Sequence, residues 1–333
     1  MAGVPPGHDF LVQPPYESAS GFALIPHEVT LAYDDAVRQR TVDLDGPVHY
    51  LDFGGEGQPL LMVHGLGGNA MNWMAVGPEL ARTHHALALD LAGFGRTPLF
   101  RRSAAVGANA QLVHRFIQEV IGEPVVLMGN SMGGHIAILE GADHPRSVSA
   151  LVLVDPAIPG AHVRRPDPAM LSVMAALTLP GLAEVLLDRR IRMLGPERLV
   201  RETMALVAAD PSRISDELFD AHVQLTRERG NLGRQNGRAF LQASRTLGLR
   251  MADPRFWARV KKIEAPTLVV HGELDRLIPV AAARALGRRR PDWTLVVIPG
   301  VGHVPMMETP DLFLDVINQW LTYRIAPEPA TVS

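Results

Sequence analysis

Short runs of apolar residues alternate with longer stretches of helical periodicity along most of this chain. The apolar runs occupy residues 60–64, 85–90, 125–129, 150–155, 267–271 and 294–298. Continuous runs rich in Val and Leu are typical of strands that are covered on both faces of a parallel sheet. Their alternation with helical stretches predicts βαβ units.

Two further strands precede this series. Residues 40–44 and 48–53 are apolar-rich segments separated by Asp45-Gly46, a pair suited to a hairpin turn with positive φ. With this hairpin, the pattern predicts an α/β fold in which helices flank a mostly parallel sheet of eight strands.

The strand pattern stops between residues 156 and 254, where the sequence becomes helical. Candidate helices cover residues 170–179, 182–194, 197–209 and 216–224. We interpret residues 156–254 as an inserted helical cap, so that residues 40–155 and 255–325 form the core. Residues 1–39 are rich in proline and show no sustained period, which predicts an extended N-terminal arm.

Composition excludes several classes of protein. A chain of 333 residues, 47% of them hydrophobic, can bury a large core, and its formal net charge of -3 offers no basic field for nucleic acid. The chain contains no cysteine, which excludes disulfides, thiolate metal sites and a cysteine nucleophile. The N-terminus lacks the apolar stretch of a secretory signal, and no run reaches the roughly 18 apolar residues of a membrane span. We therefore expect a cytoplasmic protein without stable membrane insertion, and the oligomeric state stays open.

A nucleophile motif follows the run at 125–129. Residues 129–133 read GNSMG, which matches G-x-S-x-G, and a helical pattern comes directly after them. A serine in such a tight strand-to-helix turn needs neighbours two positions away that carry almost no side chain, and Gly129 and Gly133 meet that need. Ser131 is therefore the candidate nucleophile.

A second glycine-rich loop, HGLGG at residues 64–68, follows the run at 60–64. In enzymes with the G-x-S-x-G turn, an N–H of this loop and the N–H after the serine together bind the oxyanion. We assign these roles to Leu66 and Met132. His64 is expected to brace the loop rather than to act as the base.

A serine hydroxyl needs a histidine to take its proton, and that histidine needs a carboxylate to hold its tautomer. His303 lies in a glycine-rich loop beyond the last apolar run, so it can reach the carboxyl edge of a parallel sheet. Asp275 follows the run at 267–271 and gives the expected order serine, aspartate, histidine. Asp155, at the end of LVLVDP, is the alternative acid. Asp90 is expected to cap or brace Arg96.

Six segments together resemble the alpha/beta-hydrolase superfamily. They are HGLGGNAMNW, DLAGFGRT, GNSMGG, LVLVDPA, HGELDRLIP and PGVGHVPMMETP. The resemblance implies the alpha/beta-hydrolase fold and a serine hydrolase, but it does not select the substrate. GNSMGG and HGLGG look like the branch that includes meta-cleavage product hydrolases. That branch usually has tryptophan after the catalytic histidine, where this chain has Val304, and this difference favours esters.

The expected activity is hydrolysis of carboxylic esters with small to medium, mainly apolar acyl groups, through an acyl-enzyme on Ser131. This chemistry needs a small-molecule ester and no metal or organic cofactor. Candidate pocket residues are Trp73, Asn130, Met170, Met174 and Met306, with ordinary core as the alternative for Trp73, Met170 and Met174. The other functions left open are carbon-carbon bond hydrolysis of meta-cleavage products, a lipase and a non-catalytic ligand-binding protein.

Overall fold

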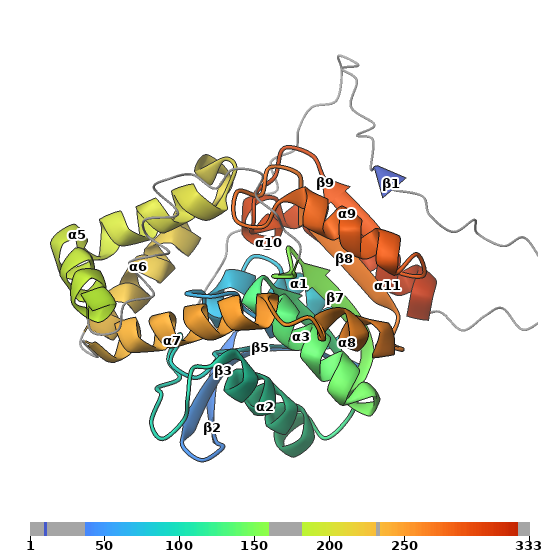
Figure 1. Cartoon of the computed structure of the whole chain (residues 1–333), viewed down its shortest axis with the longest axis horizontal. Coiled ribbons are helices and arrows are strands. Elements are labelled where there is room, and N and C mark those ends of the chain that lie inside the picture. Colours follow the sequence, from blue (N-terminus) through green and yellow to red (C-terminus); the bar gives the residue numbers. More distant parts are fainter. Residues whose placement is uncertain (1–9, 12–36, 160–181, 231–233, 326–333) are drawn as a thin grey trace, which may run out of the picture.

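A computed structural model describes residues 10–11, 37–159, 182–230 and 234–325 of the chain. A single twisted sheet runs through the centre, and helices lie on both of its faces (Figure 1). The strand order is β1-β9-β8-β7-β6-β4-β5-β3-β2. β2 and β3 pair antiparallel, β3 pairs antiparallel with β5, and all the other neighbours are parallel.

The eight predicted strands are confirmed, with ends that differ by two residues at most. Their bounds are β2 Arg38–Asp43, β3 Pro47–Gly54, β4 Pro59–Val63, β5 His85–Leu89, β6 Val125–Asn130, β7 Val148–Val154, β8 Thr267–Gly272 and β9 Thr294–Ile298. The predicted turn pair Asp45-Gly46 has φ of 57° and 120°. A ninth strand, β1 (Phe10–Leu11), comes from the segment predicted as an extended arm and pairs in parallel with β9.

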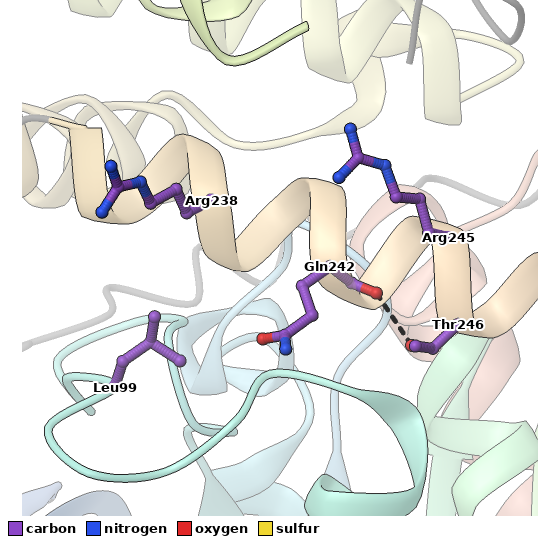
Figure 2. Close-up of a pocket in the computed structure, with 5 residues that line it drawn as sticks. All are labelled: Leu99, Arg238, Gln242, Arg245 and Thr246. Atoms are coloured by element: carbon purple, nitrogen blue, oxygen red, sulfur yellow. Dashed lines mark hydrogen bonds between the residues drawn. The ribbon is translucent and has the colours of Figure 1, made fainter. Parts of the chain in front are cut away.

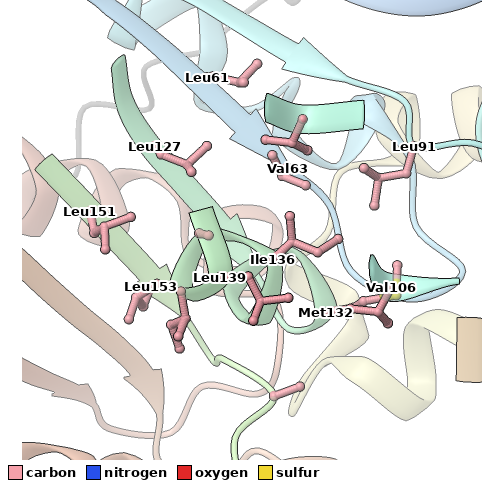
Figure 3. Close-up of a cluster of buried hydrophobic side chains, with 14 of the residues drawn as sticks. Leu61, Val63, Leu91, Val106, Leu127, Met132, Ile136, Leu139, Leu151 and Leu153 are labelled. Atoms are coloured by element: carbon pink, nitrogen blue, oxygen red, sulfur yellow. The ribbon is translucent and has the colours of Figure 1, made fainter. Parts of the chain in front are cut away.

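The parallel strands are buried on both faces because their side chains alternate between two hydrophobic clusters. Leu61 and Val63 belong to one cluster, whereas Leu60 and Met62 belong to the other. The first cluster is covered by α2 (Val106–Phe116), α3 (Met132–Asp143), α8 (Phe256–Lys262) and α9 (Val280–Arg289). Figure 3 shows α3 in this cluster, where Met132, Ile136 and Leu139 lie against the leucines of the strands.

The second cluster lies on the opposite face of the sheet. It is covered by η1 (Ala70–Trp73), α1 (Gly77–Leu80), α10 (Pro305–Glu308) and α11 (Pro310–Ile325). Short helical segments at η2 (Ile117–Ile121), η3 (Pro145–Ser147) and η4 (Pro211–Arg213) complete the connections. No helix in the described ranges is long and apolar enough to cross a membrane.

The inserted helical region contains α5 (Leu182–Val207), α6 (Asp216–Gly230) and α7 (Arg234–Met251) (Figure 1). α5 joins two of the predicted helices across a break at Gly195, whose φ is 69°, and Pro196 begins the second half. α6 extends six residues past its predicted end at residue 224. The candidate helix at 170–179 lies outside the described residues.

α7 was not predicted from the sequence. Its buried positions include Ala239, Ala243 and Leu247, which recur every four residues and join the first cluster. Two of the three are alanines, so the helical pattern is hard to recognise in the sequence although its spacing is regular. Small side chains let α7 lie close to the main sheet domain.

Side chains of α7 cap the start of α2. The N-cap residue of α2, Ala105, has no side chain that can accept a hydrogen bond from the first turn. Instead, Thr246 Oγ1 accepts from the N–H of Val106 at 3.1 Å, and Gln242 Oε1 accepts from the N–H of Ala104 at 2.9 Å. These bonds satisfy backbone donors that a helix start leaves open, and they tie the inserted region to the core.

A surface pocket lies beside this junction (Figure 2). Its lining residues are Leu99, Arg238, Gln242, Arg245 and Thr246. The side chains of Leu99 and Gln242 face one another across it, and Thr246 also donates to the carbonyl of Gln242 at 2.8 Å. Of the residues predicted to line a substrate pocket, the three that the structure describes, Trp73, Asn130 and Met306, do not contribute to it.

The capping by α7 predicts a measurable loss of stability in Thr246→Val. The substitution keeps the shape of the side chain but removes the acceptor of the Val106 N–H, so the free energy of unfolding should fall by about 1 kcal/mol. Urea unfolding measures this value. Thr203→Val is the matched control, because exposed Thr203 bonds only to its own helix, at the carbonyl of Leu199. Equal losses in the two variants would contradict a capping role.

Candidate active site

Four polar residues follow four adjacent parallel strands at the carboxyl edge of the sheet. Ser131 comes directly after β6 and Asp155 directly after β7, while Asp275 and His303 lie in the loops after β8 and β9. Since β6, β7, β8 and β9 are neighbours in that order, their carboxyl ends bring these loops together. Ligand and catalytic sites of α/β sheets form at this edge.

Ser131 occupies a strained turn, with φ of 55° and ψ of −113°. Its N–H donates to the carbonyl of Val154 at 2.9 Å, which fixes the turn against β7. A Cβ at position 129 would lie 2.3 Å from the carbonyl oxygen of Gly133, and one at position 133 would lie 2.2 Å from that of Val63. Only glycine fits at both positions, as the motif predicts.

The two N–H groups assigned to the oxyanion hole lie close to this turn. Met132 is the first residue of α3, so its N–H has no partner inside the helix. Among the hydrogen bonds of the described residues, neither the N–H of Met132 nor that of Leu66 donates to another group. The loop before Leu66 touches the turn, because a Cβ on Gly65 would lie 3.0 Å from Ser131 Cβ.

His303 and Asp275 form a buried pair. His303 Nδ1 lies 2.6 Å from Asp275 Oδ2, and the other oxygen of Asp275 accepts from the N–H groups of Leu277 at 2.7 Å and Ile278 at 3.0 Å. Burial would raise the pKa of Asp275, but the hydrogen bond and charge of His303, aided by the hydrogen bond from the Ile278 N–H, lower it below its ordinary value. Asp275 is therefore an ionised partner that holds the ring of His303.

The backbone of His303 is anchored by two other parts of the chain. Its N–H donates to the carbonyl of Val207, at the end of α5, at 2.7 Å. Its carbonyl accepts from Asn130 Nδ2 at 3.0 Å, and Asn130 precedes Ser131. The base candidate is thus tied both to the inserted region and to the turn of the nucleophile. In the described structure, Ser131 Oγ and His303 do not form a hydrogen bond, and such bonds often tighten only with substrate in place.

Glu308 supports the same loop, although it was not among the site residues predicted from the sequence. One oxygen of this buried carboxylate accepts from the N–H groups of Gly302 at 2.8 Å and Ala209 at 3.0 Å, and the other accepts from the N–H of Asp210 at 3.0 Å. It therefore joins the loop of His303 to the end of α5. The available signal was an acidic residue directly after the apolar residues Pro305, Met306 and Met307.

Of the two acids that the sequence left open, Asp275 is the one bound to His303. Asp155 Oδ1 instead accepts from the N–H of Gly272 at 2.9 Å. Burial, followed by the charge of Asp275, raises the pKa of Asp155 well above its ordinary value.

The predicted pocket residues lie in different surroundings. Trp73 and Met306 have no exposed surface and belong to the second hydrophobic cluster. For Trp73 this burial favours the alternative interpretation of ordinary core. Asn130 is also buried, and its amide is used to hold His303 and Val154. Met170 and Met174 lie outside the described residues.

His64 braces the loop of Leu66, as expected. Its Nδ1 donates to the carbonyl of Gly65 at 2.7 Å, and its Nε2 accepts from the N–H of Leu91 at 3.1 Å. Burial lowers the pKa of His64, so the ring stays neutral and can accept this second bond.

Two groups of side chains in the described residues bring three possible metal ligands within 4.8 Å of one another. One group is Asp155, Asp275 and His303, which belongs to the site above. The other is His114, Glu140 and His144, where Glu140 Oε1 already accepts from His114 Nδ1 at 2.9 Å and from Ser147 Oγ at 2.5 Å.

Comparison with known proteins agrees with this arrangement. Residues 60–316 match the model of the Alpha/beta hydrolase family. The chain belongs to this family. The mostly parallel sheet, the inserted helical region and the strand-to-helix turn of this alpha/beta hydrolase confirm the fold predicted from its motifs.

Relatives of this alpha/beta hydrolase cleave different bonds. It is 29% identical over 300 residues to 2-hydroxy-6-oxo-6-(2'-aminophenyl)hexa-2,4-dienoic acid hydrolase of Metapseudomonas resinovorans, covering 87% of this chain and 93% of the relative. It is 26% identical to pimeloyl-[acyl-carrier protein] methyl ester esterase of Aeromonas hydrophila, covering 80% and 96%. A solved serine hydrolase involved in carbazole degradation has a TM-score of 0.67 and 25% identity, covering 87% and 100%. The chain is thus a hydrolase whose bond type these relatives leave open.

A further buried carboxylate, Asp90, holds the loops around the oxyanion segment. Asp90 Oδ1 accepts from the N–H of Ala70 at 2.7 Å, and its Oδ2 accepts from the N–H of Arg96 at 2.8 Å and from His49 Nδ1 at 2.7 Å. Burial would raise the pKa of Asp90, but the hydrogen bond and charge of His49 lower it. The predicted bracing of Arg96 thus uses the backbone of that residue, while its guanidinium pairs with Glu228.

Asp90→Asn should lower the free energy of unfolding by about 3 kcal/mol near neutral pH, because an amide would face these donors with an NH₂ group. A lowered native pKa stabilises the fold above the ordinary value of 3.8, and this stabilisation is lost as the pH falls through the native pKa. The difference from the parent should therefore shrink in acid. Denaturant unfolding at a series of pH values from roughly 3 to 8 measures this difference. The exposed variant Asp220→Asn is the control. A difference independent of pH would contradict an ionised Asp90.

Proposed function

We propose that this alpha/beta hydrolase cleaves carboxylic esters of small to medium, mainly apolar acyl groups through an acyl-enzyme on Ser131. The observation that carries the proposal is the position of Ser131 in its strained turn, at the same sheet edge as the buried His303–Asp275 pair with its 2.6 Å hydrogen bond. A nucleophile, a base and an acid that orients the base are the groups that acyl transfer needs.

In the proposed mechanism, His303 Nε2 takes the proton of Ser131 Oγ as that oxygen attacks the ester carbonyl. The N–H groups of Leu66 and Met132 stabilise the oxyanion, because both lie beside the turn and neither has another acceptor among the described residues. His303 then gives its proton to the departing alcohol. Water attacks the acyl-enzyme by the same route and releases the acid, while Asp275 stays ionised and stabilises the imidazolium.

The residue after His303 supports esters over carbon-carbon bonds. This position holds Val304, whose side chain is buried in the second hydrophobic cluster. The meta-cleavage branch that the motifs resemble usually has tryptophan there, and valine offers neither its aromatic face nor its N–H. The similarity to a methyl ester esterase also supports this choice.

We expect the protein to release nitrophenol from para-nitrophenyl esters, with the highest rate on acetate to medium-chain esters. Ser131→Ala should lower kcat by at least roughly 10⁴-fold, because it removes the nucleophile. Ser149→Ala is the matched control, since Ser149 lies near the start of β7, away from the carboxyl edge of the sheet. Equal rates in the parent and Ser131→Ala on every ester would contradict the proposal.

Carbon-carbon hydrolysis is the second candidate, and it is favoured by the relatives that are hydrolases of dienoic and dienedioic acids. Besides the relative described above, the chain is 28% identical over 292 residues to a 2-hydroxy-6-oxononadienedioate hydrolase of Pseudomonas putida. Turnover of a vinylogous 1,5-diketone, followed by loss of its absorbance, measures this activity directly. A diketone rate far above every ester rate would replace the first candidate with the second.

The proposed reaction uses a small-molecule ester, water, and side-chain and backbone groups of this chain. Cytoplasmic localisation stays a prediction from the sequence.

A further inference from the structure

Asp155 lies beside the catalytic pair without being bound to the base. It follows β7 directly, its side chain has no exposed surface, and its φ is 45°, in the left-handed region. Ligand atoms of Asp155, Asp275 and His303 lie within 4.8 Å of one another. Two aspartates therefore share one buried space next to one histidine.

The two aspartates differ in how many hydrogen bonds they accept. Asp275 accepts three, from His303 Nδ1 and from two backbone N–H groups. Asp155 Oδ1 accepts one, from Gly272, and its Oδ2 accepts none from the described residues. Two adjacent buried carboxyl groups cannot both ionise at low cost, and the proton stays on the one whose charge is less well solvated. By this count the proton belongs to Asp155.

The other titratable groups around Asp155 do not supply a positive charge. His271 Nδ1 lies 3.6 Å from Asp155 Oδ1, too far for a hydrogen bond, and its Nε2 donates to the carbonyl of Ile278 at 2.8 Å. Burial lowers the pKa of His271 to about 4, so its ring is neutral. Glu308, on α10, adds a further negative charge that disfavours ionisation of Asp155. His303 is already the partner of Asp275.

We propose that Asp155 is a positioning residue, a neutral carboxylic acid that donates its proton in a hydrogen bond to Asp275. Asp275 would then accept four hydrogen bonds and keep a single negative charge directed at His303. This inference rests on the proposed function only for its effect on rate, because Asp155 acts through Asp275 and His303. Its protonation can be tested without a substrate.

The first test is infrared spectroscopy of the parent and Asp155→Asn near neutral pH. A protonated carboxyl group has a carbonyl stretching band separate from those of carboxylates, so the difference spectrum should show that band lost in Asp155→Asn. Asp90→Asn is the matched control, since Asp90 is equally buried but accepts three hydrogen bonds and is ionised. No lost band, or the same loss in both variants, would overturn the proposal.

The second test is kinetic and uses the similar shapes of asparagine and a neutral aspartic acid. Asparagine at position 155 can accept from Gly272 with its oxygen and donate to Asp275 with its NH₂ group, as the neutral acid does. Asp155→Asn should therefore lose less than about five-fold in kcat/KM, whereas Asp155→Ala should lose about 10- to 100-fold through displacement of Asp275. Asp275→Asn, which reverses the tautomer of His303, should lose about 10⁴-fold.

The acid limb of the pH profile of kcat/KM reports the essential base of the free enzyme. In Asp155→Asn its midpoint should stay where it is in the parent, since no charge has been removed. A lower midpoint, or a loss as large as that of Asp275→Asn, would show that Asp155 acts as an ionised acid and would overturn the proposal.

Stability against pH keeps the inference testable if no ester is turned over or if Asp155→Ala does not fold. A native pKa raised above the ordinary value of 3.8 gives stability that is lost as the pH rises toward the native pKa. Asp155→Asn should therefore become steadily more stable relative to the parent above that ordinary value, while Asp90→Asn should not. A constant difference between Asp155→Asn and the parent would contradict a protonated Asp155, whatever the outcome of the ester assays.

Discussion

The turn between β6 and α3 holds a serine in a conformation that costs of order 1–3 kcal/mol, and the surrounding structure must offset this strain. The backbone of Ser131 is bound on both sides. Its N–H donates to Val154, and its carbonyl accepts from the N–H groups of His135 and Ala157. Close packing of Gly129 and Gly133 leaves the turn no room to relax. The hydroxyl and the free N–H of the next residue are therefore presented together at the edge of the sheet.

The rest of the site is organised around that fixed point by parts of the chain that lie far apart in sequence. Parallel pairing of β6 to β9 brings their carboxyl ends side by side, which places the acid and the base within reach of the turn. The end of the inserted helix α5 also holds the site. The end of α5 binds the backbone of His303 through Val207, and Glu308 joins that end to the histidine loop. The position of the base candidate is thereby tied to the end of α5.

Burial acts on three aspartates of this domain with opposite results, because the number of donors around each differs. Asp90 and Asp275 each accept three hydrogen bonds, including one from a histidine, and their pKa values are lowered. Asp155 accepts one and has a second carboxylate as its neighbour, so its pKa is raised. The charge of a buried carboxyl group follows from its local donors and not from its residue type.

The sequence by itself determined the eight main strands, the glycines of the turn and the candidate nucleophile, base and acid, because these signals are local. Continuous apolar runs and turn residues depend on near neighbours along the chain. Only the tertiary structure decided that His303 pairs with Asp275 and not Asp155, and that Glu308 and α7 support the site. Those outcomes depend on distances and donors contributed by residues up to about 140 positions apart, which no local pattern encodes.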